Sequence, residues 1–237
     1  MDALLHPPID FAHRGARTRR PDNTIEAFRL ALGLGAAGLE SDAWLTEDGV
    51  VVLDHDGLVR QGLGGLRRTA IAATPRSRLP SHIPSLEELY DACGASFELS
   101  LDVRNPLAAG AVVDAASQFD GALEHLWLCS PDWEQAAEWR SLSDGIHLVD
   151  STRLRKIREG PERRAATLAD RGIDALNLHH SDWTGGLTTL FHRFERCALA
   201  WDCQHERVMV ALLAMGIDAI YSDDVETMVR VLEAFLR

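Results

Sequence analysis

Short apolar runs alternate with amphipathic stretches along nearly the whole chain. The apolar runs have the length of strands, whereas the amphipathic stretches repeat their apolar residues at the spacing of a helix. Strands are predicted at 9–13, 38–45, 96–103, 125–129, 145–149, 175–178, 197–201 and 219–221, with a further strand-like run at 50–54. Helices are predicted at 23–35, 85–92, 108–118, 131–140, 161–171, 186–194, 206–215 and 225–236. Eight strand–helix units within 237 residues predict one (β/α)₈ TIM-barrel domain that spans the chain.

The segment at about 56–84 interrupts this alternation. It is rich in Gly, Arg, Pro and Ser and shows no period, so we interpret it as a long loop or a small insertion after the second strand. The helices on either side have recognisable starts, because Asn23 with Glu26 and Ser85 with Glu88 have the spacing of a capping box. An open doubly wound sheet is the structural alternative, but the Gly-rich phosphate loop that usually follows its first strand is missing.

Charge and cysteine content narrow the range of partners. The chain has 24 Lys and Arg against 36 Asp and Glu, a formal net charge of −12. Because nucleic acids and anionic membrane surfaces bind basic patches, this balance argues against both as routine partners, while a small phosphate-containing substrate still fits a local basic pocket. The four cysteines form no CxxC pair and lie in apolar surroundings, so we expect reduced thiols in a cytoplasmic protein. No signal peptide and no membrane span are expected, and the oligomeric state is left open.

Acidic residues mark the second and third predicted barrel strands. Barrel enzymes place their chemistry at the carboxyl ends of the strands. Glu40 and Asp42 are two residues apart on one strand, so their side chains face the same way, and Asp102 on the next strand can join them. Carboxylates aimed at one point repel one another unless a cation relieves them, so the three predict a hard divalent cation, Mg²⁺ or Ca²⁺. For any one of these acids alone, a solvated side chain or a structural ion pair is the better interpretation.

Two histidines and two arginines complete the candidate site. His13 ends the first strand and His55 follows the run after the second, and imidazole groups titrate near neutral pH. Two such groups on either side of a phosphorus atom can act as general base and general acid. Arg14 and Arg104 can bind phosphate oxygens, or can form surface ion pairs instead.

These motifs resemble the glycerophosphodiester phosphodiesterase family. The resemblance is carried by His13-Arg14-Gly15, Pro21-Asp22-Asn23-Thr24, Gly38-Leu39-Glu40-Ser41-Asp42, Leu45-Thr46-Glu47-Asp48-Gly49-Val50, His55-Asp56, Ile83-Pro84-Ser85-Leu86-Glu87-Glu88 and Gly216-Ile217-Asp218-Ala219-Ile220-Tyr221-Ser222-Asp223. An HRG tripeptide alone is a weak signal, but its combination with ExD, the turn and HD at these spacings is a strong one.

The resemblance implies metal-dependent hydrolysis of glycerophosphodiesters to glycerol 3-phosphate and an alcohol, on a (β/α)₈ barrel. It also implies one divalent cation held by the three acids, His13 and His55 as the acid/base pair, and Arg14 on the phosphate. Trp201, at the end of the seventh strand, matches an aromatic residue that lines the family's pocket, whereas packing alone would assign it to the core. We expect Arg104 to contact the substrate as well.

Several positions depart from the family pattern. Asp22 and Asp102 stand where Glu is usual, Arg104 stands where Lys is usual, and residues 57–68 lack the Arg-Thr-Thr pattern that often follows HD. These departures leave the leaving alcohol open. The alternatives are a phosphodiesterase of the phospholipase-like or sugar-phosphodiester kind, with residues 57–78 as its recognition loop, and a barrel that binds a phosphodiester without catalysis.

Overall fold

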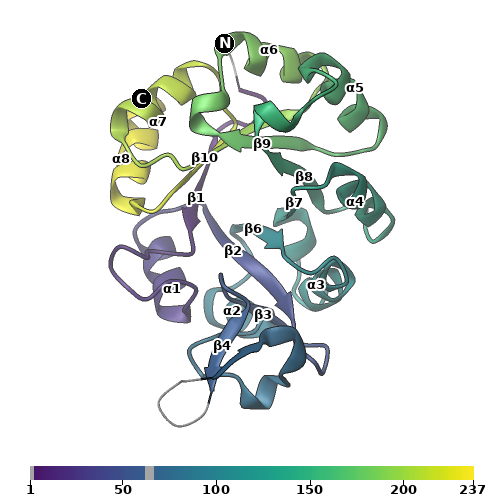
Figure 1. Cartoon of the computed structure of the whole chain (residues 1–237). Helices are drawn as coiled ribbons and strands as arrows, with labels where there is room; N and C mark the ends of the chain where they lie inside the picture. Colours follow the sequence, from purple (N-terminus) through teal and green to yellow (C-terminus); the bar gives the residue numbers. More distant parts are fainter. Residues whose placement is uncertain (1–2, 62–66) are drawn as a thin grey trace.

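The computed structural model describes residues 3–61 and 67–237 and shows a closed barrel of parallel strands surrounded by helices (Figure 1). The predicted (β/α)₈ TIM barrel is therefore confirmed. The barrel strands follow one another in the order β1, β2, β6, β7, β8, β9, β10 and β11, and β1 closes the barrel by pairing with both β2 and β11.

Every predicted strand and helix is present, with ends that differ by a few residues. The barrel strands are β1 (Ile9–His13), β2 (Gly38–Leu45), β6 (Glu98–Val103), β7 (Leu126–Ser130), β8 (His147–Thr152), β9 (Ala175–His179), β10 (Cys197–Trp201) and β11 (Ala219–Ser222). The helices are α1 (Ile25–Gly33), α2 (Leu86–Cys93), α3 (Ala108–Ala116), α4 (Trp133–Glu138), α5 (Pro161–Asp170), α6 (Gly185–Arg193), α7 (Glu206–Ala214) and α8 (Val225–Phe235). Ser85 and Glu88 form the predicted capping box at the start of α2.

Two apolar layers hold the barrel, because successive residues of each strand face either its interior or the helices. In the interior, Phe11 stacks on Tyr221 with ring centroids 4.7 Å apart, and Trp127 packs edge-on against Phe11. Gly38 is required beside this cluster, since a Cβ there would lie 2.6 Å from the Phe11 ring. The larger layer, which includes Leu101, lies between the strands and the helices.

The start of α1 corrects one prediction. Thr24, not Asn23, caps this helix, and its hydroxyl accepts a hydrogen bond from the Ala27 backbone N–H at 3.2 Å. Asn23 instead adopts a left-handed backbone with φ 53°, and its side-chain oxygen accepts a hydrogen bond from the Ser41 hydroxyl at 2.7 Å. Asn adopts this conformation more readily than most residues do. The predicted capping box of Asn23 and Glu26 was therefore wrong, because Asn23 is used to tie α1 to β2.

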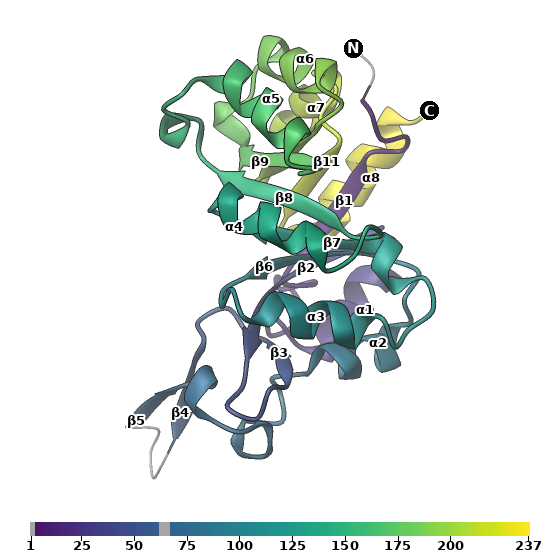
Figure 2. The ribbon, with the colours of Figure 1, turned by 90° about the vertical axis from the view of Figure 1, so that its right-hand side faces the viewer.

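The chain leaves the barrel between β2 and α2 (Figure 2). β3 (Val51–Leu53) pairs antiparallel with the end of β2, and β4 (Leu58–Gln61) and β5 (Arg67–Ala70) form a hairpin that projects from the barrel. Two short 3₁₀ helices, η2 (Ile71–Ala73) and η3 (Arg76–Arg78), follow the hairpin. The segment predicted as irregular therefore contains local structure, and residues 62–66 of it lie outside the described residues.

A small apolar cluster attaches this segment to the barrel. Its buried members are Val52, Val59, Ile71, Leu79 and Ile83, and they pack against Trp44 of β2. The four cysteines of the chain are free. Over residues 3–61 and 67–237, none of the helices has the length and the apolar character needed to cross a membrane.

Candidate active site

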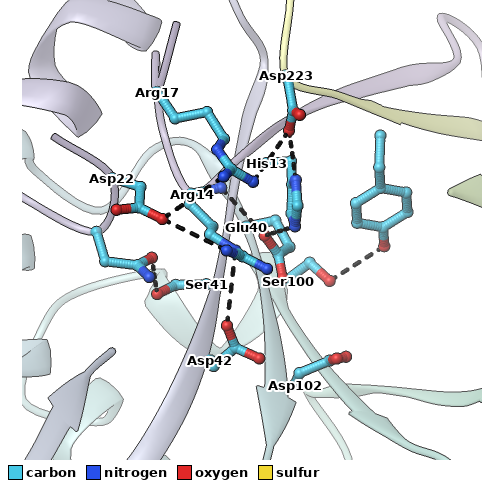
Figure 3. A network of polar contacts seen from close by, with 12 residues as sticks. His13, Arg14, Arg17, Asp22, Glu40, Ser41, Asp42, Ser100, Asp102 and Asp223 are labelled. Carbon is cyan, nitrogen blue, oxygen red and sulfur yellow. Dashed lines mark hydrogen bonds and ion pairs between the residues drawn. The ribbon is translucent and has the colours of Figure 1, made fainter. Parts of the chain in front are cut away.

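Strand register brings the three predicted ion ligands together at the carboxyl end of the barrel. In the parallel pairing of β2 with β6, Asp42 lies beside Asp102, and Glu40 lies two residues earlier on the same face of β2. The three carboxylates offer ligand atoms that all lie within 4.8 Å of one another. Figure 3 shows Glu40 beside His13 and Arg14, with Asp42 and Asp102 below them. We call Glu40, Asp42 and Asp102 the acid triad.

The acid triad has the properties of a cation site. Burial raises the pKa of Glu40 to about 7, with His13 opposing the rise and the two neighbouring acids adding to it. Burial also raises the pKa of Asp102 to about 6, against the attraction of Arg104. Oδ2 of Asp42 is buried and has no hydrogen-bond partner. A divalent cation fits these residues, because it would supply the missing partner and allow all three carboxylates to ionise.

Two guanidinium groups contact the acid triad. Nη2 of Arg104 lies 2.6 Å from Oδ1 of Asp42 and 3.0 Å from Oδ2 of Asp102. Nε of Arg14 lies 4.0 Å from the other oxygen of Asp42, and its Nη1 lies 3.4 Å from Oδ2 of Asp22. Asp42 therefore has a cation near each of its oxygens.

His13 is held between two carboxylates. Its Nδ1 lies 2.5 Å from Oδ1 of Asp223, and its Nε2 lies 3.7 Å from Oε2 of Glu40 (Figure 3). Burial lowers the pKa of His13, but Glu40 and the hydrogen bond to Asp223 outweigh burial, so the pKa is raised overall. Arg17 also contacts Asp223, with Nη1 at 3.6 Å from Oδ1. One imidazole nitrogen is thus fixed by Asp223, and the other faces the acid triad.

The geometry of the turn after β1 explains why Arg14 and Gly15 follow His13 in the HRG tripeptide. The backbone N–H of Arg14 donates to the Glu40 carbonyl at 2.9 Å and to Oε2 of the same residue at 3.1 Å. Gly15 follows with φ 75°, and a Cβ at this position would lie 2.7 Å from the carbonyl carbon of Ala27. Only glycine fits both the conformation and the space. The tight turn ties the end of β1 to β2 and α1, and so positions His13 and Arg14 at the acid triad.

A cavity of about 750 Å³ opens over the acid triad. Its near wall comes from the ends of β1, β2, β6 and β11 and carries His13, Arg14, Arg17, Glu40, Asp102, Arg104 and Asp223. Its far wall comes from the ends of β8, β9 and β10 and carries Arg153, Arg155, Lys156, Asn177, Trp201 and Asp202, among others. Trp201 lines the cavity and also packs against the apolar cluster inside the barrel. Its contact with a substrate stays a prediction.

Two predicted site residues, Asp42 and His55, are not among the residues that line this cavity, and Asp42 is buried beside Asp102. His55 lies in an exposed loop. Its side chain is 43% exposed, and its Nδ1 lies 2.8 Å from Oδ1 of Asp56. The loop that carries His55 is nevertheless attached to the site, because the backbone N–H of Asp54 donates to the Asp42 carbonyl at 3.1 Å. Its catalytic role stays a prediction.

Comparisons with known proteins agree with this geometry. The model of the glycerophosphoryl diester phosphodiesterase family matches residues 13–102. A glycerophosphodiester phosphodiesterase from Bacillus altitudinis is 24% identical, over 94% of this chain and 97% of its own length. The chain is thus similar to glycerophosphoryl diester phosphodiesterases, through the family model over residues 13–102 and through this relative over most of its length.

Solved structures share the fold. The glycerophosphodiester phosphodiesterase of Thermotoga maritima is 22% identical, with a TM-score of 0.80 over 94% of this chain and 98% of that one. A phosphodiesterase of Oleispira antarctica, solved in complex with the product sn-glycerol-3-phosphate, is 20% identical, with a TM-score of 0.79 over 95% of this chain and 97% of that one.

The family match ends at Asp102, so it contains the acid triad and both predicted histidines but not the far wall of the cavity. Apart from Trp201, sequence reasoning missed the residues of the same wall, and it also missed Asp223 as the partner of His13. An acid directly after the last barrel strand is a signal that could have identified Asp223. Arg155, Lys156 and Asn177 carry no such signal, because only the closed barrel places them opposite the acid triad.

A second group of possible ligands lies on the far wall of the cavity. His179, His180 and Asp202 offer ligand atoms within 4.8 Å of one another. Nε2 of His179 already lies 3.2 Å from Oδ2 of Asp202, which is largely exposed. The acid triad is the stronger ion site, because it is more buried and has an oxygen without a partner.

Proposed function

We propose that this protein is a phosphodiesterase that hydrolyses glycerophosphodiesters to glycerol 3-phosphate and an alcohol, with one divalent cation and histidine acid/base catalysis. The similarity of residues 13–102 to the glycerophosphoryl diester phosphodiesterase family supports this enzyme class. The observation that carries the proposal is that Glu40 and Asp102 of the acid triad and the His13–Asp223 pair line one wall of a cavity of about 750 Å³, with Asp42 buried beside them. The sn-glycerol-3-phosphate in the Oleispira antarctica structure supports the same substrate class.

The acid triad would hold the cation, Mg²⁺ or Ca²⁺, through carboxylate oxygens. When bound, the ion supplies positive charge against the phosphate oxygens and against the charge that develops at phosphorus. Arg14 and Arg104 would bind phosphate oxygens through their planar guanidinium groups, which suit two parallel hydrogen bonds. These contacts would orient the phosphodiester so that its phosphorus atom is open to the attacking hydroxyl group or water beside His13.

His13 would transfer a proton at Nε2. Because Asp223 accepts the Nδ1–H of His13, Nε2 is free to take a proton from the attacking hydroxyl group or water. The imidazolium that forms is stabilised by Asp223 and by Glu40, whose Oε2 lies 3.7 Å away. Asp223 therefore fixes the orientation of the His13 ring, and the two carboxylates partly balance the positive charge that the ring gains with the proton.

His55 would protonate the leaving alcohol. This role is supported by the position of His55 in a loop that is hydrogen-bonded to the Asp42 backbone through Asp54. This role requires the imidazole to turn away from Asp56 and toward the cavity. Replacement of either histidine with Ala should lower kcat by about 10²- to 10⁴-fold, as the loss of a general acid or base does. A His55→Ala variant with near-normal turnover would leave His13 as the sole acid/base residue.

The decisive assay is release of glycerol 3-phosphate from glycerophosphocholine, glycerophosphoethanolamine and glycerophosphoglycerol, with Mg²⁺, with Ca²⁺ and with a chelator. We expect turnover that requires the ion and is lost in His13→Ala at unchanged melting temperature. Turnover that persists in the presence of chelator would show that the reaction does not need a divalent cation. Binding of these compounds without turnover, from folded protein with either ion, would instead identify a non-catalytic barrel.

The partner that we propose is thus a small phosphodiester rather than nucleic acid, in keeping with the net charge of −12. We also propose a cytoplasmic location, which the four free cysteines support, because thiols stay reduced in that compartment. Fractionation of cells that express the tagged full-length protein tests this location, and recovery from the periplasm or the medium would contradict it.

A further inference from the structure

The far wall of the cavity carries cations that the proposed chemistry does not use. Arg153, Arg155 and Lys156 lie in and beside η6 (Leu154–Lys156), directly after β8, and all three line the cavity. The chain as a whole has a net charge of −12. This local concentration of positive charge is therefore opposite in sign to the rest of the molecule.

The three cations differ in how much of their charge is free. Arg153 is paired with Asp182, with Nε 2.6 Å from Oδ2 and Nη2 3.2 Å from Oδ1, and its guanidinium lies 5.6 Å from the centre of the Trp201 ring. Arg155 and Lys156 are exposed and form no ion pair with any residue in the described part of the chain. The guanidinium of Arg153 is thus held in place by its ion pair, while the charges of Arg155 and Lys156 remain available to a ligand.

A buried acceptor lies on the same wall. Asn177 of β9 lines the cavity and is only 5% exposed. Its Nδ2 donates to the Ser151 hydroxyl at 3.3 Å, which fixes the orientation of the amide. Its Oδ1 is buried and has no hydrogen-bond partner. Because an unpaired buried acceptor is unfavourable, this oxygen indicates a ligand that donates a hydrogen bond here.

The guanidinium groups of the near wall all lie within 4.0 Å of carboxylates. Arg14 and Arg17 contact Asp22, Arg17 also contacts Asp223, and Arg104 pairs with two members of the acid triad. A second anionic group on a substrate would therefore be attracted to the far wall. We call Ser151, Arg155, Lys156 and Asn177 the distal subsite.

We propose that the distal subsite binds a hydroxylated alcohol that carries its own phosphate, so the preferred substrate is a glycerophosphodiester with a phosphorylated polyol as its second alcohol. This inference rests on the proposed function. A hydroxyl group of the polyol donates to Oδ1 of Asn177, and its phosphate lies against Arg155 and Lys156. The same two charges disfavour a cationic alcohol such as choline.

The test compares two substrates that differ only in one phosphate, glycerophosphoinositol and glycerophosphoinositol 4-phosphate. The readout is the ratio of their kcat/KM values, measured by release of glycerol 3-phosphate from the full chain with Mg²⁺ or Ca²⁺. In the unmodified protein we expect a preference of about tenfold or more for the phosphorylated compound, since charge-assisted contacts are the stronger kind. The double variant Arg155→Gln, Lys156→Gln should bring the ratio close to one.

Arg158→Gln is the matched control, because Arg158 lies in the same loop and is exposed but does not line the cavity. It should leave the ratio unchanged. In parallel, calorimetric titration with inositol 4-phosphate and with inositol measures binding to the distal subsite without turnover. Only the phosphorylated compound should bind measurably, and the double variant should lose that binding.

The outcomes separate this inference from the proposed function. Turnover of glycerophosphoinositol without a preference for its phosphorylated form overturns the distal subsite and leaves the phosphodiesterase activity standing. A preference that persists in the double variant also overturns it. No turnover of either substrate, together with inositol 4-phosphate binding that depends on Arg155 and Lys156, overturns the proposed activity and supports the subsite.

Discussion

Asp223, at the end of the last barrel strand, holds the imidazole of His13, at the end of the first, with 2.5 Å between Oδ1 and Nδ1. The two residues are 210 positions apart in the chain. They meet because β1 pairs in parallel with β11, with Ala12 beside Ser222 in the register. The acid/base residue of the proposed mechanism is thus positioned by the same pairing that closes the barrel.

Replacement of Asp223 with Asn tests this relationship. The variant should lower kcat by about tenfold or more, because the imidazolium loses its compensating charge. Asp223 raises the pKa of His13, so its removal should move the acid limb of the kcat/KM profile to lower pH. A pH–rate profile measures both effects. Asp114→Asn, on the exposed face of α3, is the control, and an unchanged profile in Asp223→Asn would show that His13 acts without this partner.

Ion binding at the acid triad should stabilise the folded protein. A ligand that binds only the folded state at a concentration of 100 Kd adds about 2.7 kcal/mol to the free energy of unfolding. We therefore expect Mg²⁺ or Ca²⁺ to raise the melting temperature of the unmodified protein, and a chelator to reverse the rise. Asp42→Asn should abolish the ion-dependent rise, while Asp144→Asn, an exposed change of the same kind, should keep it. An equal rise in Asp42→Asn would locate the ion elsewhere.

Arg104 should oppose the ion while assisting the substrate. Its guanidinium occupies oxygens of Asp42 and Asp102 that the ion would use. Arg104→Gln should therefore bind the ion more tightly, by roughly 1 kcal/mol or more for the loss of a competing charge-assisted contact, and should lower kcat/KM by weakening phosphate binding. Ion titration by calorimetry and steady-state kinetics measure the two effects separately. Weaker ion binding in this variant would mean that Arg104 supports the ion site instead of competing with it.

Asp10 should make stability depend on pH. Its side chain is 2% exposed, its Oδ1 accepts a hydrogen bond from the Ala37 backbone N–H at 2.7 Å, and burial raises its pKa from 3.8 to about 6 against that bond. Because the folded pKa is the higher one, the folded state binds the proton more tightly. The stability from protonated Asp10 is present below about pH 4 and is lost as the pH rises through about 6.

The Asp10→Asn variant keeps the hydrogen-bond acceptor and removes the charge. At pH 8 its free energy of unfolding should therefore be roughly 1–3 kcal/mol higher than that of the unmodified protein. The difference should shrink toward pH 4. Urea unfolding at the two pH values measures it, with Asp114→Asn as the exposed control. A difference that does not change with pH would mean that Asp10 stays ionised in the folded protein.

Much of the fold could be predicted because its signals are local. A strand such as 9–13 or 197–201 and a helix such as α5 are recognisable from a few neighbouring residues, and their number implies the barrel. The capping of α1 was predicted wrongly because Asn23 and Thr24 are both acceptable caps, and only the contact of Asn23 with Ser41 selects between them. The hairpin of β4 and β5 was missed because its sequence shows no alternation.

The sequence by itself determined which groups the near wall contains. The two-residue spacing of Glu40 and Asp42 sets their common direction, since the side-chain period of a strand is two. Only the tertiary structure decided what these groups contact. It places Asp102 beside Asp42 and Asp223 against His13. It also places two unpaired cations and a buried amide oxygen on the opposite wall of the cavity. The physical reason is that these contacts join strands far apart in the chain, and their distances are set by the closure and register of the barrel, which no local pattern encodes.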